Sequence, residues 1–65
     1  MKVKINGNLK EVSSSNLLEI LKELGFDHQR YVVVLNENIV PKSQVAETLV
    51  NEGDDIEILT IMGGG

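Results

Sequence analysis

The chain has 65 residues and a formal net charge of −4, and it contains no cysteine. A chain this short forms one small domain, and without cysteine neither a disulfide nor a thiolate metal site can stabilise it. The acidic charge and the scarcity of aromatic residues argue against nucleic-acid binding, which favours basic surfaces and stacking side chains. Its apolar stretches are too short to span a bilayer, and its first residues lack the apolar region of a signal peptide. We therefore expect a soluble, cytoplasmic protein that binds neither nucleic acid nor membrane.

The first predicted elements are two strands joined by a tight turn. Val3 and Ile5 alternate with polar residues, which is the pattern of a half-buried strand. Asn6 and Gly7 predict a type I′ turn, because both central positions of that turn require positive φ. A second strand over residues 9–12 is then expected to return antiparallel.

An amphipathic helix is predicted next. Four apolar residues have the i, i+3, i+4, i+7 spacing of one helix face: Leu17, Ile20, Leu21 and Leu24. Asn16 and Glu19 have the spacing of a capping box at the helix N-terminus. Gly25 is expected to end the helix in a left-handed conformation, with Phe26 packing back on Leu21.

The second half of the chain predicts short strands and turns. Residues 31–35 form a nearly continuous apolar run, which is typical of a strand covered on both faces. A turn at 36–38 and a short extension at 39–40 follow, and Pro41 prevents further ladder bonding. Residues 43–49 are weakly helical, with Val45, Ala46 and Leu49 expected to face inward.

A last turn over residues 51–54 leads into a final strand over residues 55–61. The order of elements predicts a two-layer α+β fold, in which one main helix packs on a mixed sheet.

Few side chains in this sequence suit catalysis or metal binding. His28 is the single histidine and lies in a polar stretch, so we interpret it as a surface residue. Without cysteine or a second histidine, the chain cannot assemble a nucleophile–base pair or a His/Cys metal cluster. Glu52, Asp54 and Asp55 surround a glycine turn but lack the ligand spacing of a calcium loop, so they predict a charged turn. We expect no catalytic residue, metal or bound cofactor of the chain's own.

The carboxyl end carries the most informative motif. Gly63, Gly64 and Gly65 directly follow an apolar, strand-like run. Glycine has no Cβ, so such a tail can enter a slot that is too narrow for other residues. Beyond Met62 the one reactive group is the α-carboxylate of Gly65, and an extended tail would reach about 13 Å. A frayed terminus or residues left by cloning are the alternative interpretations. We predict one folded domain over residues 1–61 and a flexible tail over residues 62–65.

In combination these features resemble the β-grasp sulfur carriers, most closely the ThiS family of thiamine-biosynthesis sulfur carriers. The matching positions are Asn36, Ile39–Val40–Pro41, Gly53–Asp54 and Gly64–Gly65, where that family has its Asn, Val-Pro, Gly-Asp and Gly-Gly. The resemblance covers essentially the whole chain, and Gly63 is one glycine beyond the family's minimum. It implies a β-grasp (ubiquitin-like) fold with a mixed four- to five-stranded sheet packed on one main helix.

The resemblance also implies a function and partners. In the β-grasp sulfur carriers an E1-like (ThiF-like) adenylyltransferase uses ATP and magnesium to join the terminal carboxylate to AMP. Sulfur from a donor such as a cysteine desulfurase then gives a thiocarboxylate, and a ThiG-like thiazole synthase receives the sulfur. In this sequence the modified residue would be Gly65. A MoaD-like carrier for molybdopterin, a ubiquitin-like protein modifier and a non-covalent subunit stay open as alternatives.

The last predicted strand has apolar residues on both faces. By analogy with the fold, Ile56 and Ile58 are expected to face the helix, with Leu59 and Ile61 on the outer face beside Val32 or Val34. An exposed apolar patch beside the tail suggests a surface for a partner protein. The residues expected to dock that partner are Val32, Val34, Leu59, Ile61 and Met62.

Overall fold

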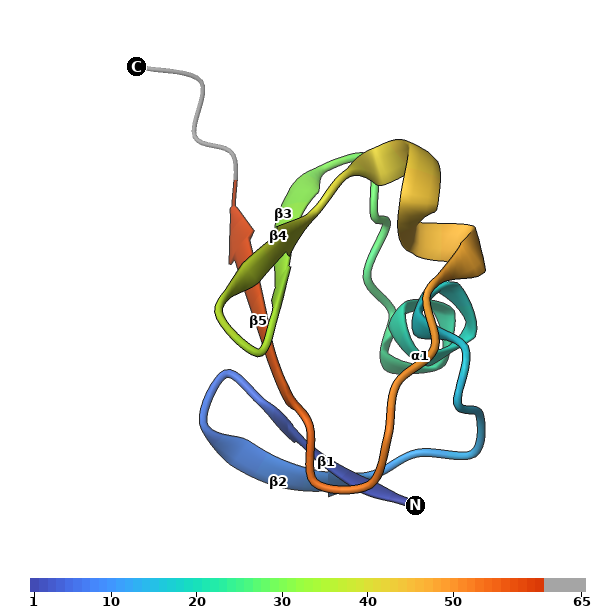
Figure 1. Ribbon diagram of the computed structural model, residues 1–65, viewed down its shortest axis with the longest axis vertical. Helices are drawn as coiled ribbons and strands as arrows, with labels where there is room; N and C mark the ends of the chain where they lie inside the picture. Colours follow the sequence, from blue (N-terminus) through green and yellow to red (C-terminus); the bar gives the residue numbers. More distant parts are fainter. Residues whose placement is uncertain (61–65) are drawn as a thin grey trace.

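Five strands form one mixed sheet, and the helical segments pack against one of its faces (Figure 1). The strands are β1 (Lys2–Ile5), β2 (Asn8–Glu11), β3 (Tyr31–Leu35), β4 (Asn38–Val40) and β5 (Asp55–Thr60), and their order across the sheet is β2-β1-β5-β3-β4. β1 and β5 are parallel, and the other neighbouring pairs are antiparallel. The helical segments are α1 (Leu17–Leu24) and the 3₁₀ helix η1 (Lys42–Glu47). The predicted two-layer α+β arrangement with a mixed sheet is confirmed.

This computed structural model describes residues 1–60. Ile61, which ends the predicted last strand, and the predicted tail over residues 62–65 lie outside the described residues. Within residues 1–60 no helix has the length and apolar content needed to cross a bilayer, since α1 has eight residues.

Both hairpins turn through two residues with positive φ. Asn6 has a φ of 51° and Gly7 a φ of 86°, as the predicted type I′ turn requires. The turn between β3 and β4 uses Asn36 at 49° and Glu37 at 71°. A two-residue loop pairs the flanking residues directly, so β2 begins at Asn8, one residue earlier than predicted.

Caps define both ends of α1. The Glu19 N–H donates to Asn16 Oδ1 at 3.1 Å, which is the first half of the predicted capping box. The second half differs, because the Asn16 N–H donates to Ser14 Oγ at 3.0 Å instead of to Glu19. At the other end Gly25 has a φ of 85°, and the Phe26 N–H donates to the Leu21 carbonyl at 2.8 Å. This is the Schellman arrangement that the glycine predicted.

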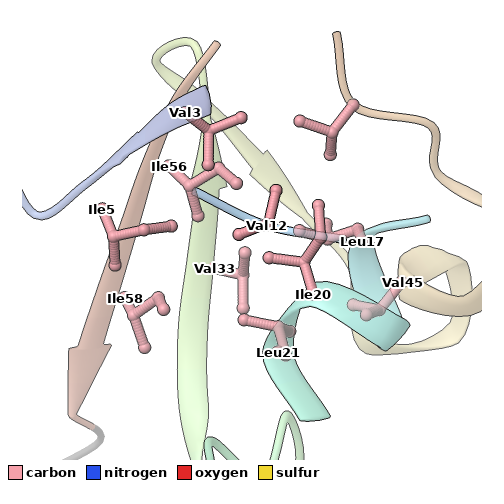
Figure 2. Packing of buried hydrophobic residues seen from close by; sticks show 11 residues of the cluster. Val3, Ile5, Val12, Leu17, Ile20, Leu21, Val33, Val45, Ile56 and Ile58 are labelled. Atoms are coloured by element: carbon pink, nitrogen blue, oxygen red, sulfur yellow. The ribbon is translucent and has the colours of Figure 1, made fainter. Parts of the chain in front are cut away.

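The core lies between the sheet and the two helical segments (Figure 2). Its members are aliphatic side chains exposed by 6% or less: Val3, Ile5, Val12, Leu17, Ile20, Leu21, Val33, Val45, Val50, Ile56 and Ile58. Phe26 and Tyr31 pack at its margin, with ring centroids 5.2 Å apart in an edge-to-face geometry. Burying one such aliphatic side chain contributes about 1.5–3 kcal/mol to folding.

One expectation about burial in β3 is wrong. Val33 is buried, but Val32 and Val34 are only half-buried, because the helical segments cover a single face of the sheet. The continuous apolar run in β3 therefore reflects one core face and one partly open face.

The expected inward face of residues 43–49 is also partly wrong. Val45 is buried as predicted, but Ala46 is exposed and Leu49 is 69% exposed. The segment is a 3₁₀ helix with three residues per turn, and it ends at Thr48 in an extended conformation. In extended backbone the side chains alternate, so Leu49 points outward and Val50 enters the core.

Candidate functional site at the end of the central strand

β5 leads toward the carboxyl end and lies at the centre of the sheet. β3 pairs with it from Ile56, opposite Leu35, to Thr60, opposite Tyr31. β1 pairs with only its first residues, and that pairing ends where Ile5 lies opposite Ile56.

Beyond that point the side chain of Asn6 takes the place of a neighbouring strand. The Ile58 N–H donates to Asn6 Oδ1 at 2.7 Å, and Asn6 Nδ2 donates to the Ile58 carbonyl at 3.3 Å. The backbone of β5 is thus held on both sides as far as Ile58.

The two faces of β5 differ as predicted. Ile56 is fully buried and Ile58 is 6% exposed, so both belong to the core. Leu59 is 48% exposed and points to the other face. Alternation along the strand places Glu57 on the same open face.

Four apolar side chains gather on this open face, and we call them the outer patch: Val32, Val34, Ile39 and Leu59. Leu59 lies directly opposite Val32, and Ile39 lies directly opposite Val34. Residues directly opposite each other in antiparallel strands share a face and touch. Ile39 is 70% exposed and lies in β4, the edge strand, so the patch reaches the edge of the sheet. An apolar surface of this kind is typical of a site for another protein.

The outer patch contains three of the five residues predicted to dock a partner. Val32, Val34 and Leu59 come together there, whereas Ile61 and Met62 lie outside the described residues, as do Gly63, Gly64 and Gly65. Ile39 was not predicted as part of the site. The turn predicted over residues 36–38 has only two residues, 36–37, in the structure, because Asn38 already pairs with Leu35. That register sets Ile39 against Val34.

Charged residues border the patch on the side of β1. Glu57 lies opposite Val34, and Asp55 lies opposite Lys4 of β1. All three of these charged side chains are exposed. The border next to the apolar side chains is therefore acidic, and a basic residue follows one strand further away.

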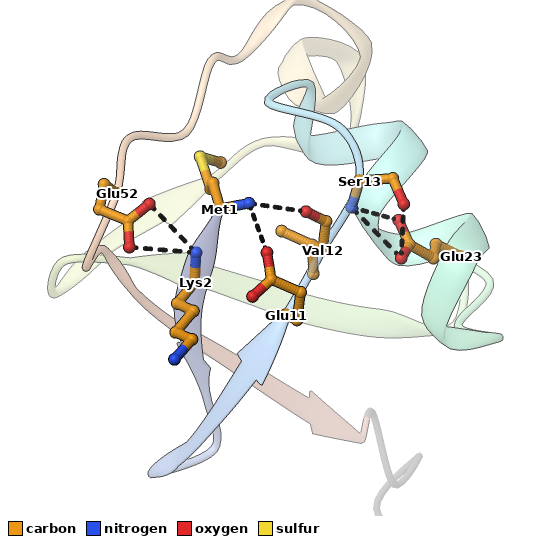
Figure 3. Close-up of polar contacts among 7 residues, drawn as sticks. All are labelled: Met1, Lys2, Glu11, Val12, Ser13, Glu23 and Glu52. Carbon is orange, nitrogen blue, oxygen red and sulfur yellow. Dashed lines mark hydrogen bonds and ion pairs between the residues drawn. The ribbon is translucent and has the colours of Figure 1, made fainter.

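Other acidic residues bind backbone groups near Met1, at the opposite end of the sheet (Figure 3). The Met1 amino group donates to Glu11 Oε2 at 2.7 Å and to the Val12 carbonyl at 3.1 Å. The Glu11 carboxylate raises the pKa of the Met1 amine, and the amine lowers the pKa of Glu11. The Lys2 N–H donates to both carboxylate oxygens of Glu52, at 3.1 and 3.2 Å.

The acidic residues of the turn over residues 51–54 therefore have structural roles. Asp54 Oδ2 accepts a hydrogen bond from the Asn51 N–H at 2.8 Å, and Glu52 holds β1. Within residues 1–60 no three His, Asp or Glu side chains converge as a metal site would require. The outer patch beside the end of β5 is therefore the surface whose role is considered below.

A mixed five-stranded sheet packed on one main helix defines a β-grasp protein, as predicted. The crystal structure of the thiamine biosynthesis protein ThiS from Geobacter metallireducens has the same fold, with a TM-score of 0.86 and 32% sequence identity. The match covers 100% of this chain and 100% of that one.

Sequence comparison gives the family. The pattern of the ThiS family matches residues 3–65. The sulfur carrier protein ThiS from Thermus thermophilus is 30% identical over 61 residues, which are 94% of this chain and 95% of that protein. A thiazole synthase from Paramagnetospirillum magneticum is 46% identical over 66 residues, where this chain is covered completely but spans only 20% of the longer protein. The chain belongs to the ThiS family, and the predicted resemblance is confirmed.

Proposed function

We propose that this ThiS-type sulfur carrier of thiamine biosynthesis holds its sulfur as a thiocarboxylate on Gly65. The observation that carries the proposal is the ThiS-family match, which runs through the glycine motif to Gly65. A second observation supports it, because the chain contains no cysteine and so cannot hold sulfur as a persulfide. The carboxylate of Gly65 is then the one group suited to hold sulfur covalently.

The proposed chemistry has two steps, both performed by a partner. A carboxylate resists nucleophilic attack because its charge is delocalised and oxide is a poor leaving group. In the first step an oxygen of the Gly65 carboxylate attacks the α-phosphorus of ATP, and pyrophosphate leaves. In the second step a hydrosulfide-equivalent nucleophile attacks the carbonyl carbon, and AMP leaves with the bridging oxygen. The product is a thiocarboxylate, which stores reduced sulfur as a nucleophilic anion.

In this proposal the chain is a protein co-substrate with no catalytic residue of its own. An E1-like, ThiF-like adenylyltransferase supplies the ATP and magnesium site, and a donor such as a cysteine desulfurase supplies sulfur. A ThiG-like thiazole synthase accepts the sulfur. The last assignment is supported by the Paramagnetospirillum thiazole synthase, of which a segment similar to this chain makes up 20%. A carrier joined to its acceptor in one chain has a high effective concentration at the acceptor's site.

The outer patch is the proposed docking surface for the adenylyltransferase. It continues along the open face of β5 to Leu59, one residue before the described chain ends at Thr60. A partner bound there would lie beside the carboxyl end, so residues 62–65 could act as the tail that enters the partner's site. We propose that Ile39 belongs to this surface, together with Ile61 and Met62.

The proposal is tested by reconstitution with the purified ThiF-like enzyme, magnesium, ATP, a cysteine desulfurase and free cysteine. The intact mass of the chain should rise by the difference between one sulfur and one oxygen atom. The matched controls are a chain without Gly65 and a chain with a tag fused after Gly65, and neither should change in mass. Conjugates on lysines without any thiocarboxylate would instead favour the ubiquitin-like modifier. Sulfur loading of the extended chain without processing would disprove the role of Gly65.

A further inference from the structure

Asn6 belongs to the turn between β1 and β2 and also binds β5. It is followed by Gly7 in the turn between β1 and β2, and its side chain is bound to β5 by the two bonds to Ile58, at 2.7 and 3.3 Å. Its own N–H donates to the Ile56 carbonyl at 2.9 Å. Asparagine followed by glycine is chemically labile, because no side chain on the second residue hinders attack on the asparagine amide.

We propose that Asn6 is a deamidation site and that its hydrogen bonds to Ile58 restrain the reaction while β5 is in place. The deprotonated backbone nitrogen of Gly7 attacks Cγ of Asn6, and a C–N bond forms to close a five-membered succinimide ring. The bond from Cγ to Nδ2 breaks, and ammonia leaves with the proton that the nitrogen gave up. Water then opens the ring at either carbonyl and yields aspartate or isoaspartate. The reaction consumes one water molecule and involves no oxidation or reduction.

Access does not limit this reaction in the folded chain. Gly7 is exposed, and a Cβ atom placed on it would have no neighbouring atom within 4 Å. The orientation of the Asn6 amide limits it instead. Oδ1 accepts from one backbone group of Ile58 while Nδ2 donates to another, so Cγ cannot turn toward Gly7 until both bonds break. The left-handed backbone of Asn6, with a φ of 51°, also belongs to the hairpin turn, so cyclisation requires the turn to open.

Deamidation would weaken the hold on β5. An aspartate at position 6 keeps an oxygen for the Ile58 N–H but lacks the Nδ2 donor and sets a negative charge against the Ile58 carbonyl. An isoaspartate lengthens the backbone of a turn that pairs Ile5 directly with Asn8. Either product loosens the strand one residue before Leu59 of the outer patch.

Asn36 provides a matched control within the same chain. It also has positive φ, at 49°, and its Oδ1 also binds β5, accepting from the Asp55 N–H at 2.9 Å. The next residue is Glu37, whose side chain hinders the attacking nitrogen. Asn36 should therefore stay intact under conditions that convert Asn6.

The test incubates the full chain at mildly alkaline pH, folded in buffer and unfolded in urea, and follows both sites by peptide mapping with isoaspartate detection. We expect Asn6 to react in urea, Asn36 to stay intact in both conditions, and folding to slow the reaction at Asn6 about tenfold or more. Equal rates at Asn6 in buffer and urea would refute the restraint. Equal rates at Asn6 and Asn36 in urea would refute the site.

A pair of core variants separates local release of β5 from global unfolding. Ile58→Val loosens the residue that holds Asn6, and Ile20→Val makes the same change in α1. At buffer conditions that give both variants the same overall stability, Ile58→Val should speed the reaction at Asn6 more than Ile20→Val. If the two variants react at one rate, global unfolding controls the site and the local restraint is wrong.

Discussion

At three points in this small chain an asparagine side chain binds backbone groups that would otherwise need a backbone partner. Asn6 and Asn36 bind β5 from its two sides, and Asn16 caps α1. Asparagine suits these positions because its short amide can both donate and accept. At Asn6 and Asn36 it also tolerates the positive φ of the turns, whereas Asn16 is extended with a φ of −90°. The turn at Asn6 and the cap at Asn16 could be predicted from neighbouring residues. The bonds to β5 could not, because the Asn6 amide meets a residue 52 positions away and the Asn36 amide one 19 positions away.

Asn16 makes two hydrogen bonds, and two substitutions can separate their contributions to stability. Its Oδ1 caps the Glu19 N–H, and its Nδ2 donates to the Ala46 carbonyl at 2.9 Å, which ties α1 to η1. Asn16→Ala should lower the free energy of unfolding by about 1–2 kcal/mol, because it removes both bonds. Asn16→Asp keeps the cap and should cost less. Urea unfolding measures both variants, and equal losses would show that the cap contributes nothing.

The ion pair between the Met1 amine and the Glu11 carboxylate should contribute to stability only within a window of pH. The folded-state pKa of the amine is raised above 8.0, so its contribution is complete below pH 8.0 and is lost as pH rises through the raised value. The pKa of Glu11 is lowered below 4.5, so its contribution is present above pH 4.5 and is lost as pH falls through the lowered value.

Glu11→Gln should therefore reduce stability slightly at neutral pH, with the difference from the parent chain shrinking toward both extremes. Both groups contact solvent, so the effect should also shrink in high salt. Thermal unfolding at several pH values is the measurement. A difference that stays as large at acid and alkaline pH as at neutral pH would contradict the assignment.

At the scale of whole elements, alternation along β5 grouped its side chains into two faces and analogy with the fold identified the core face correctly. The apolar run of β3, in contrast, was misleading. A strand covered on both faces and a strand with one open face can have the same apolar composition, so the apolar run itself does not distinguish them. The outer position expected for Val32 or Val34 came from analogy with the fold. Burial of Val50 was missed for another reason. The change from 3₁₀ to extended backbone at Thr48 resets the side-chain period within three residues, which is too short a stretch for pattern analysis.

The two faces of β5 predict opposite outcomes for the same substitution. Leu59→Asp should change the free energy of unfolding by no more than about 0.5 kcal/mol, because the side chain is 48% exposed. It should weaken binding of the ThiF-like enzyme strongly, since an interface core tolerates an unpaired charge poorly. Ile58→Asp should unfold the domain, because it buries a charge in the core. Calorimetry of folding and of binding tests both, and an unfolded Leu59→Asp chain would contradict the assignment of faces.

Ile39 and Leu49 form a matched pair for the outer patch, since both are exposed aliphatic residues, at 70% and 69%. Ile39 lies on the open sheet face, whereas Leu49 follows η1 and pairs with Asn16. Ile39→Asp should raise the Kd for the ThiF-like enzyme, and Leu49→Asp should leave it unchanged. Titration calorimetry measures both values, and equal effects of the two changes would remove Ile39 from the proposed surface.

For the molecule as a whole, the sequence was most informative about fold and family. The capped helix, the Asn-Gly hairpin and the glycine motif were local signals, and the β-grasp fold and ThiS family that they predicted are confirmed. The composition of the docking face depended on strand register, and Ile39 joined it only once β4 was paired with β3. The assembled sheet places the outer patch beside the last described residues of β5, and the proposed docking role depends on this arrangement.

The central claim, a thiocarboxylate on Gly65, is tested most directly on the protein isolated from its native host. Because the chain has no cysteine, a thiol-directed alkylating reagent has no side-chain thiol to modify. Intact-mass spectrometry after alkylation should therefore show a fraction of the chain carrying one sulfur in place of one oxygen and one alkyl group, both located at Gly65 by fragmentation. A chain that is never alkylated in cells that are making thiamine, and whose Gly65 is found only as a free carboxylate or an amide, would contradict the claim.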